Sequence, residues 1–154
     1  MKRLLLIITF VVVASFGLYG LNFRTEAGVA GIQSSSHVMQ SPDQIKWTKS
    51  GAGTEFALIS GDPQKEGAPF VLRLKFNDGS KVPPHWHPVD EHVTVISGTF
   101  FMGEGEKFNE SAAHEMKAGS YALMPKETRH FAWVKGETVI QIHGTGPFKT
   151  FWVK

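Results

Sequence analysis

The sequence predicts an all-β fold, and three observations support this prediction. Short segments with alternating apolar and polar residues recur along the chain, as expected for strands that bury one face. Glycine, proline, asparagine and aspartate separate these segments, and such residues favour turns. No long stretch shows a convincing helical period. About eight short strands at turn spacing therefore predict a small β-barrel.

Length and charge limit the class of protein. The chain has 154 residues, which is the length of one ordinary domain. It has 16 basic and 14 acidic residues, but Lys2, Arg3, Arg24 and Glu26 precede residue 28, so 13 of each remain beyond that point. A neutral domain without a basic cluster argues against a nucleic-acid partner. The absence of cysteine excludes disulfides, thiolate metal ligands and a cysteine nucleophile.

Residues 1–27 are expected to be a targeting segment. Lys2 and Arg3 precede a nearly unbroken apolar run from Leu4 to Leu21, as in a signal peptide. Cleavage after export to the periplasm or the medium is the favoured interpretation. The run is also long enough to span a bilayer, so a membrane anchor with the domain outside the cytoplasm is the alternative. Residues 28–36 are predicted to be a linker, and residues 37–154 the folded domain.

The first predicted strands precede the most informative stretch of the chain. Residues 41–50 suggest a turn followed by a short edge strand, and residues 54–60 a strand between glycine turns. Residues 70–76 place four apolar side chains on one face and two basic ones on the other, which predicts a half-buried antiparallel strand. Asp78 and Gly79 then form a strong turn signal.

The stretch from Gly79 to Gly98 carries the chemistry. Strand residues two apart point to the same face, so His85 and His87 project together. Glu91 shares their face if the chain stays extended through Val89. Three polar groups on one face of an apolar strand need compensation if they are buried. Imidazole nitrogens and a carboxylate oxygen suit a divalent first-row metal ion, with a fourth ligand from elsewhere in the chain.

Two further features concern this ligand set. Pro83 and Pro84 remove two backbone donors, so their segment is expected at a rim of the barrel and not in the middle of a ladder. A stiff segment at the rim would limit the motion of His85 and His87. The best candidate for the fourth ligand is His130, which a turn over residues 126–130 presents. His92 lies opposite Glu91 in the strand pattern and is expected at the surface.

The remaining elements follow the same pattern. Ser97 and Gly98 suggest a tight turn, and residues 103–117 a surface excursion with one helical turn around residues 112–116. Strands are expected at residues 121–124 and 138–143, and a short last one at residues 151–153.

The residues also carry a resemblance to a known family. Gly79, His85, His87, Glu91 and Gly98 fit every position of the first cupin motif, G-x5-H-x-H-x3-E-x6-G. The stretch therefore resembles the cupin superfamily, whose small members have a double-stranded β-helix, or jelly-roll, barrel. The two motifs with their connection span roughly a third of the chain.

The second motif, G-x5-P-x-G-x2-H-x3-N, is matched through Gly119, Pro125 and His130. Glu127 stands where the family usually has glycine, and Val134 where it usually has asparagine. Neither position binds the metal in the family, so these departures concern turn geometry and hydrogen bonding. The resemblance implies one divalent transition metal ion, such as Fe, Mn, Ni or Zn. Its implied ligands are His85, His87, Glu91 and His130.

Three hypotheses for function remain open. The ligand set resembles the mononuclear sites of cupin dioxygenases, which implies a metal-dependent enzyme acting on a small oxygen-rich compound. Tyr121, Gln141 and His143 are polar strand residues that are candidates for binding its substrate. The alternative is a metal-dependent module that binds a carbohydrate or acid without turnover. A barrel without metal is the third reading, and a homodimer is compatible with the resemblance.

Overall fold

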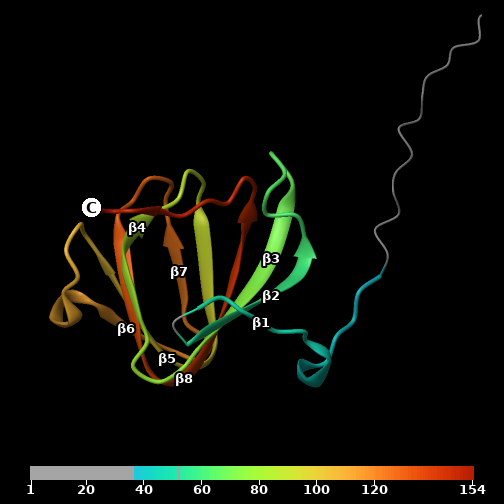
Figure 1. The fold of residues 1–154 in the computed structure, drawn as a ribbon, viewed down its shortest axis with the longest axis horizontal. Coiled ribbons are helices and arrows are strands. Elements are labelled where there is room, and N and C mark those ends of the chain that lie inside the picture. The colour runs from blue at the N-terminus through green and yellow to red at the C-terminus, as the bar shows by residue number, and fades with distance from the viewer. Residues whose placement is uncertain (1–36, 52) are drawn as a thin grey trace, which may run out of the picture. The chain divides into compact units, whose positions relative to one another are not determined.

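A computed structural model describes residues 37–51 and 53–154, so the predicted targeting segment and linker lie outside the described residues. The described strands form one antiparallel sheet of nine strands that curls back on itself (Figure 1). The all-β prediction is therefore confirmed. The elements are η1 (Pro42–Gln44), β1 (Thr48–Lys49), β2 (Thr54–Gly61), β3 (Pro69–Phe76), β4 (Lys81–Trp86), β5 (Glu91–Glu104), η2 (Glu110–Ala112), β6 (His114–Lys117), β7 (Tyr121–Met124), β8 (His130–Thr145) and β9 (Phe151–Trp152).

Strands β5 and β8 pair with each other along most of their length and belong to both layers of the fold. The first part of β8 lies between β4 and the second part of β5, which also pairs with β6. The second part of β8 lies between β3 and the first part of β5, which also pairs with β7. The β5 and β8 ribbon thus connects two layers that face each other across the core, as in a jelly roll.

The expected tight turn at Ser97 and Gly98 is absent, because β5 continues through both residues. The register with β8 shifts on either side of Ser97, so the strand has a bulge at this point. Gly98 has a φ of 79°, and a Cβ atom built on it lies 2.4 Å from the Glu137 carbonyl oxygen. Only glycine fits this close approach of two backbones. The bulge bends β5 where the chain passes from one layer to the other.

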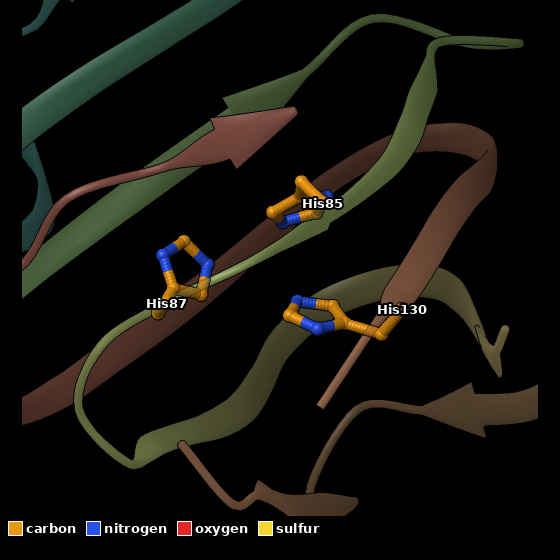
Figure 2. Close-up of side chains that lie close together, drawn as sticks. All are labelled: His85, His87 and His130. Carbon is orange, nitrogen blue, oxygen red and sulfur yellow. The ribbon is translucent and has the colours of Figure 1, made fainter. Parts of the chain in front are cut away.

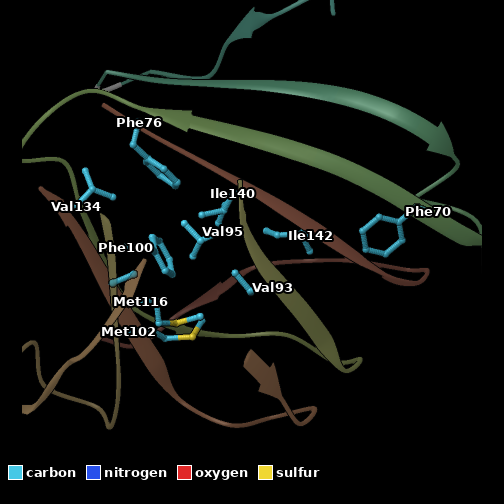
Figure 3. Packing of buried hydrophobic residues seen from close by; sticks show 11 residues of the cluster. Phe70, Phe76, Val93, Val95, Phe100, Met102, Met116, Val134, Ile140 and Ile142 are labelled. Atoms are coloured by element: carbon cyan, nitrogen blue, oxygen red, sulfur yellow. The ribbon is translucent and has the colours of Figure 1, made fainter. Parts of the chain in front are cut away.

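The core lies between the two layers (Figure 3). It is formed by the inward positions of the strands, since alternate residues of β5 and β8 are buried. Complete burial of each large apolar side chain contributes about 1.5–3 kcal/mol to folding. The cluster contains Phe70, Phe76, Val93, Val95, Phe100, Met102, Met116, Ala132, Val134, Ile140 and Ile142.

Other expectations for local structure need correction. The helical turn lies at residues 110–112 and not around residues 112–116, because residues 114–117 pair with β5 as a strand. The prediction of a turn and a short edge strand in residues 41–50 is confirmed, since a turn of 3-10 helix precedes the two-residue β1 at the edge of the sheet. The strand expected at residues 138–143 is the second part of the longer β8. Both described helices are single turns, too short to span a bilayer.

Glu127 occupies a conformation that favours glycine. Its φ is 65°, in the left-handed region, and its side chain is exposed. Its backbone N–H donates to the His87 carbonyl oxygen at 2.7 Å, and its own carbonyl oxygen accepts from the Arg129 guanidinium at 2.7 Å. The departure from the family's glycine therefore leaves the turn in place at the expense of backbone strain, which for an ordinary residue is roughly 1–2 kcal/mol.

Replacing Glu127 with glycine is expected to stabilise the protein. Relief of the strain outweighs the larger entropy of glycine in the unfolded chain, so Glu127→Gly should raise the free energy of unfolding by about 0.5–1 kcal/mol. Chemical denaturation measures this difference. Glu66→Gly is the matched control, since Glu66 is exposed and has no positive φ, and it should give no gain. Equal stability of Glu127→Gly and the wild type would contradict the strain.

Candidate metal centre

Four polar side chains meet inside the fold where β4, β5 and β8 come together. His85 lies on β4, His87 follows its last residue, Glu91 begins β5, and His130 begins β8. All four are buried, with at most 6% of any residue exposed. His85 and His130 are direct partners in the ladder between β4 and β8. The distant segment that carries His130 is therefore brought beside the histidine pair, as the sequence predicted.

Glu91 reaches the site by a different route from the one expected. The chain does not stay extended through Val89, because β4 ends at Trp86 and residues 88 and 89 form a bend. Glu91 instead starts a new strand, whose alternation buries Glu91, Val93 and Val95. The spacing predicted correctly that Glu91 lies beside the histidines, but the reason was wrong. The carboxylate belongs to a separate strand, which begins after the bend.

The proline pair lies within β4, but the ladder is interrupted around it. Val82 and His85 pair with β8, and the register shifts between them across Pro83 and Pro84. On the other edge of β4, β9 pairs only with His85 and Trp86. The prolines thus avoid positions that need a backbone donor, in agreement with their chemistry.

Backbone carbonyl oxygens orient all three imidazole rings. Nδ1 of His85 lies 2.7 Å from the Pro83 oxygen, and Nδ1 of His130 lies 2.9 Å from the Thr128 oxygen. Nδ1 of His87 lies 2.8 Å from the oxygen of Lys149. Because a carbonyl oxygen only accepts, each Nδ1 carries the proton, and in the neutral ring Nε2 bears the lone pair. This arrangement is typical of histidines that bind metals through Nε2.

The three histidines form a group that could hold a metal ion. One nitrogen of each lies within 4.8 Å of the others, and Figure 2 shows the rings around a common space. Nitrogens that bind one ion at about 2.1 Å can be at most about 4.2 Å apart, so the three rings would close in around an ion by a small shift of their side chains. Glu91 lies beside this group: its Oε2 is 3.1 Å from His130 Nε2, and its Oε1 is 3.8 Å from His87 Nε2.

Several buried nitrogen and oxygen atoms of the site lack a hydrogen-bond partner in the part of the chain that the structure describes. Among the described residues, His87 Nε2, Glu91 Oε2 and His130 Nε2 have no hydrogen-bond partner of proper geometry. His130 Nε2 and Glu91 Oε2 are nevertheless close to each other. Both atoms are hydrogen-bond acceptors when the imidazole is neutral and the carboxylate ionised, so a proton or a cation must lie between them. A single divalent cation would satisfy all three atoms together, whereas one proton satisfies only a pair. The donor set therefore fits a metal ion.

The local environment keeps two of the rings neutral. Burial and then the nearby His130 lower the pKa of His85 to about 4, and burial lowers the pKa of His87. Burial alone would raise the pKa of Glu91 and lower that of His130, but their mutual attraction outweighs it, so the pKa of Glu91 is lowered and that of His130 raised. His85 and His87 are therefore in the neutral state that binds metal, beside an ionised Glu91, whereas the raised pKa of His130 means that a metal ion has to displace its proton.

A pocket of about 480 Å³ opens in front of the site, and its lining includes His85, His87 and Glu91. A second cavity of about 40 Å³ lies on the core side and touches His85, Glu91 and His130. The larger pocket gives a small molecule access to the face that His85 and His87 present, and its size is typical of ligand sites.

The structure places the candidate substrate residues elsewhere. Tyr121, Gln141 and His143 lie on the outward face of β5, β7 and β8, because they pair in register with Thr94 and His92, which alternate with buried residues. None of the three lines the pocket beside the histidines. Polar strand residues alone do not reveal which face is outward, so the sequence could not exclude them.

His92 is also on this outward face, as expected. Its ring stacks against that of His143 with centroids 4.7 Å apart, and its Nδ1 lies 2.7 Å from the Tyr121 hydroxyl. His92, His143 and Tyr121 therefore contact one another and not the histidines of the metal site.

Sequence reasoning missed the contribution of the C-terminal segment. The Phe148 ring stacks on His87 with centroids 4.2 Å apart, and Lys149 supplies the carbonyl that orients the same ring. Trp152 lies in β9, opposite His85, with ring centroids 5.3 Å apart. No local pattern could reveal these contacts, because they depend on the C-terminal segment returning to the edge of β4.

The fold is similar to several solved structures. The polyketide cyclase RemF from Streptomyces resistomycificus has a TM-score of 0.61 at 13% identity, over 77% of this chain and 86% of that one. KdgF from Halomonas sp. has a TM-score of 0.57 at 17% identity, over 71% and 94%. The anti-sigma factor ChrR from Rhodobacter sphaeroides, in complex with SigE, has a TM-score of 0.53 at 19% identity, over 68% of this chain and 52% of that one. At identities this low, the structural similarity shows a shared fold alone.

The family is shown by the sequence itself. No curated protein matches the chain. The model of the ChrR cupin-like domain, however, matches residues 35–149, which include both histidine-bearing motifs and the strands that carry them. The predicted cupin jelly roll is confirmed. The chain is a small single-domain cupin and belongs to the ChrR cupin-like family.

Proposed function

We propose that His85, His87, Glu91 and His130 bind one divalent transition metal ion and that the site acts on a small compound held in the pocket. The observation that carries this proposal is the convergence of three oriented, buried imidazoles on a carboxylate that has no other compensation. Glu91 supplies the negative charge that offsets part of the charge of a divalent ion. The hydrogen bonds to Nδ1 hold the rings in place before binding.

The bound metal would supply a Lewis acid with positions open to ligand oxygen atoms. His85 and His87 line the pocket, while His130 lines the cavity on the core side, so a compound in the pocket would approach the site from the side of His85 and His87. A compound bound against the mainly apolar walls would displace water from the site, which would strengthen electrostatic effects there. Dioxygenase-like chemistry is the favoured reaction class, with Fe, Mn or Ni as the ion, whereas Zn would support chemistry without redox change.

A second candidate is a metal-dependent binding module without turnover. Membership in the ChrR cupin-like family supports it, since ChrR itself is an anti-sigma factor crystallised with SigE. Cupin barrels host enzymes and binding proteins alike, so the fold cannot separate the two candidates.

Loss of one ligand should weaken metal binding strongly. Protein purified without added metal is expected to contain about one transition metal ion per chain, and His87→Ala to contain at most about a tenth of that. Glu91→Gln keeps the shape of the side chain but removes its charge, and it should weaken metal binding about tenfold or more. Elemental analysis and titration with Zn²⁺ measure both effects.

Thermal unfolding provides the second readout for this prediction. A chelator should lower the Tm of the wild type but not that of His87→Ala, because only the wild type gains stability from the ion. His92→Ala is the matched control, since this histidine faces outward, and it should behave as the wild type. Unchanged metal content in His87→Ala would end the proposal of a metal centre.

Oxygen consumption distinguishes the two candidate functions. We expect the iron-loaded protein to consume oxygen with at least one member of a panel of enols and vicinal diols, and His87→Ala to lose this activity about a hundredfold or more. An oxygen electrode follows the reaction, and product analysis confirms it. Binding of a panel member without consumption or product would favour the module.

We also propose that the domain acts outside the cytoplasm. The basic start of the chain and the apolar run that follows support this proposal. Mass spectrometry of fractions from the producing cells should find a processed chain, without about the first 27 residues, in the periplasm or medium. An intact chain in the membrane fraction would indicate the anchor, and an intact chain in the cytosol would contradict export.

A further inference from the structure

The walls of the larger pocket are mainly apolar. Eight aromatic or branched aliphatic side chains line the pocket beside the histidines, and they come from β2, β3, β4, β8, β9 and the segment before β9. Hydroxyl groups come from Ser50, Thr54 and Thr150, of which Ser50 and Thr150 are exposed residues. The apolar walls are Phe56, Leu72, Leu74, Phe76, Val82, Ile142, Phe148 and Trp152.

The charges of the pocket do not favour a polyanionic or sugar-like ligand. Apart from His85, His87 and Glu91, Lys81 is the one ionisable side chain among the described residues of the lining. Its ammonium lies 2.6 Å from a carboxylate oxygen of Glu110, so its charge already has a partner. A polyhydroxylated ligand would lose hydration without enough polar groups to replace it.

Trp152 presents an aromatic ring at the pocket. It is 58% exposed and lies opposite His85 in the ladder between β4 and β9. The next residue anchors the strand, because the Val153 N–H donates to the Pro84 carbonyl oxygen at 2.9 Å. Phe151 points to the other side of β9 and stacks on Trp86, with centroids 4.4 Å apart. Only Trp152 of the two lines the pocket.

We propose that this pocket takes a planar, largely apolar compound, such as an aromatic diol or enol, whose oxygen-bearing edge faces His85 and His87 and whose ring contacts Trp152. The inference rests on the proposed metal centre and names the ligand class for it. The apolar walls bind the body of the ligand, and the charged end of the site binds its oxygen atoms. An aliphatic hydroxy acid has the same oxygen atoms but gains little from these walls.

The test compares two probes with adjacent hydroxyl groups and different bodies, 2,3-dihydroxynaphthalene and tartrate. Zinc-loaded protein is used, so that calorimetric titration measures binding without redox turnover. We expect the aromatic diol to bind about tenfold tighter than tartrate, or more. Trp152→Ala should weaken the diol about fivefold to tenfold and leave tartrate and zinc content unchanged. Trp152→Phe should retain most of the affinity.

The matched control is Phe151→Ala, which removes a neighbouring aromatic ring from the other side of the same strand and should not alter diol binding. Tighter binding of tartrate, or equal diol binding by Trp152→Ala and the wild type, would overturn the ligand class. A dimer that Trp152→Ala converts to a monomer in sedimentation would also overturn it, because the ring would then belong to an interface between copies.

Failure of the metal centre is separately visible. 2-Naphthol, which lacks the second hydroxyl group, is titrated into protein without zinc. Binding that depends on Trp152 there would support the apolar ligand class even if zinc does not bind the histidines. If zinc binds but neither naphthalene compound does, the metal centre stands and the proposed ligand class is wrong.

Discussion

The pairing of β8 with both β4 and β5 is the contact on which the rest of the structure depends. It sets His85 directly opposite His130, and it joins the two layers along one continuous ribbon. Glu91 begins the other strand of this ribbon, so the same pairing encloses its carboxylate. A shift of β8 by one residue would turn His130 to the opposite face and move its apolar neighbours out of the core. The register that builds the core therefore also builds the site.

Burial of the site destabilises the fold, and hydrogen bonds from the imidazole rings to backbone carbonyl oxygens offset part of this destabilisation. Four buried polar groups lose hydration, and apolar residues of similar volume would not. Two rings are held locally, by the carbonyl oxygens of Pro83 and Thr128 two residues earlier, whereas His87 depends on Lys149, which is distant in sequence. The C-terminal segment is thus a structural part of the centre, and binding of a cation would repay part of the cost of burial.

Family and fold establish the scaffold, while the pocket lining distinguishes one member from another. Members of the same architecture can hold the same ligand set and accept different compounds, because function depends on the side chains around the ion. In this chain those side chains are apolar walls and an aromatic ring at the mouth. They favour a ligand with a hydrophobic body, a property that the motifs alone do not specify.

The amino-acid sequence by itself determined the all-β class, the approximate strands and the positions of the histidines and Glu91, because strand alternation and turn chemistry act between near neighbours. The tertiary structure decided what residues close in sequence cannot determine. These features are the bend after which Glu91 begins a separate strand, the bulge at Gly98, the outward placement of Tyr121 and the return of Trp152 to the edge of β4. These features depend on which distant strands pair, and in which register. That choice is made by burial of the whole core, so no short stretch of sequence contains it.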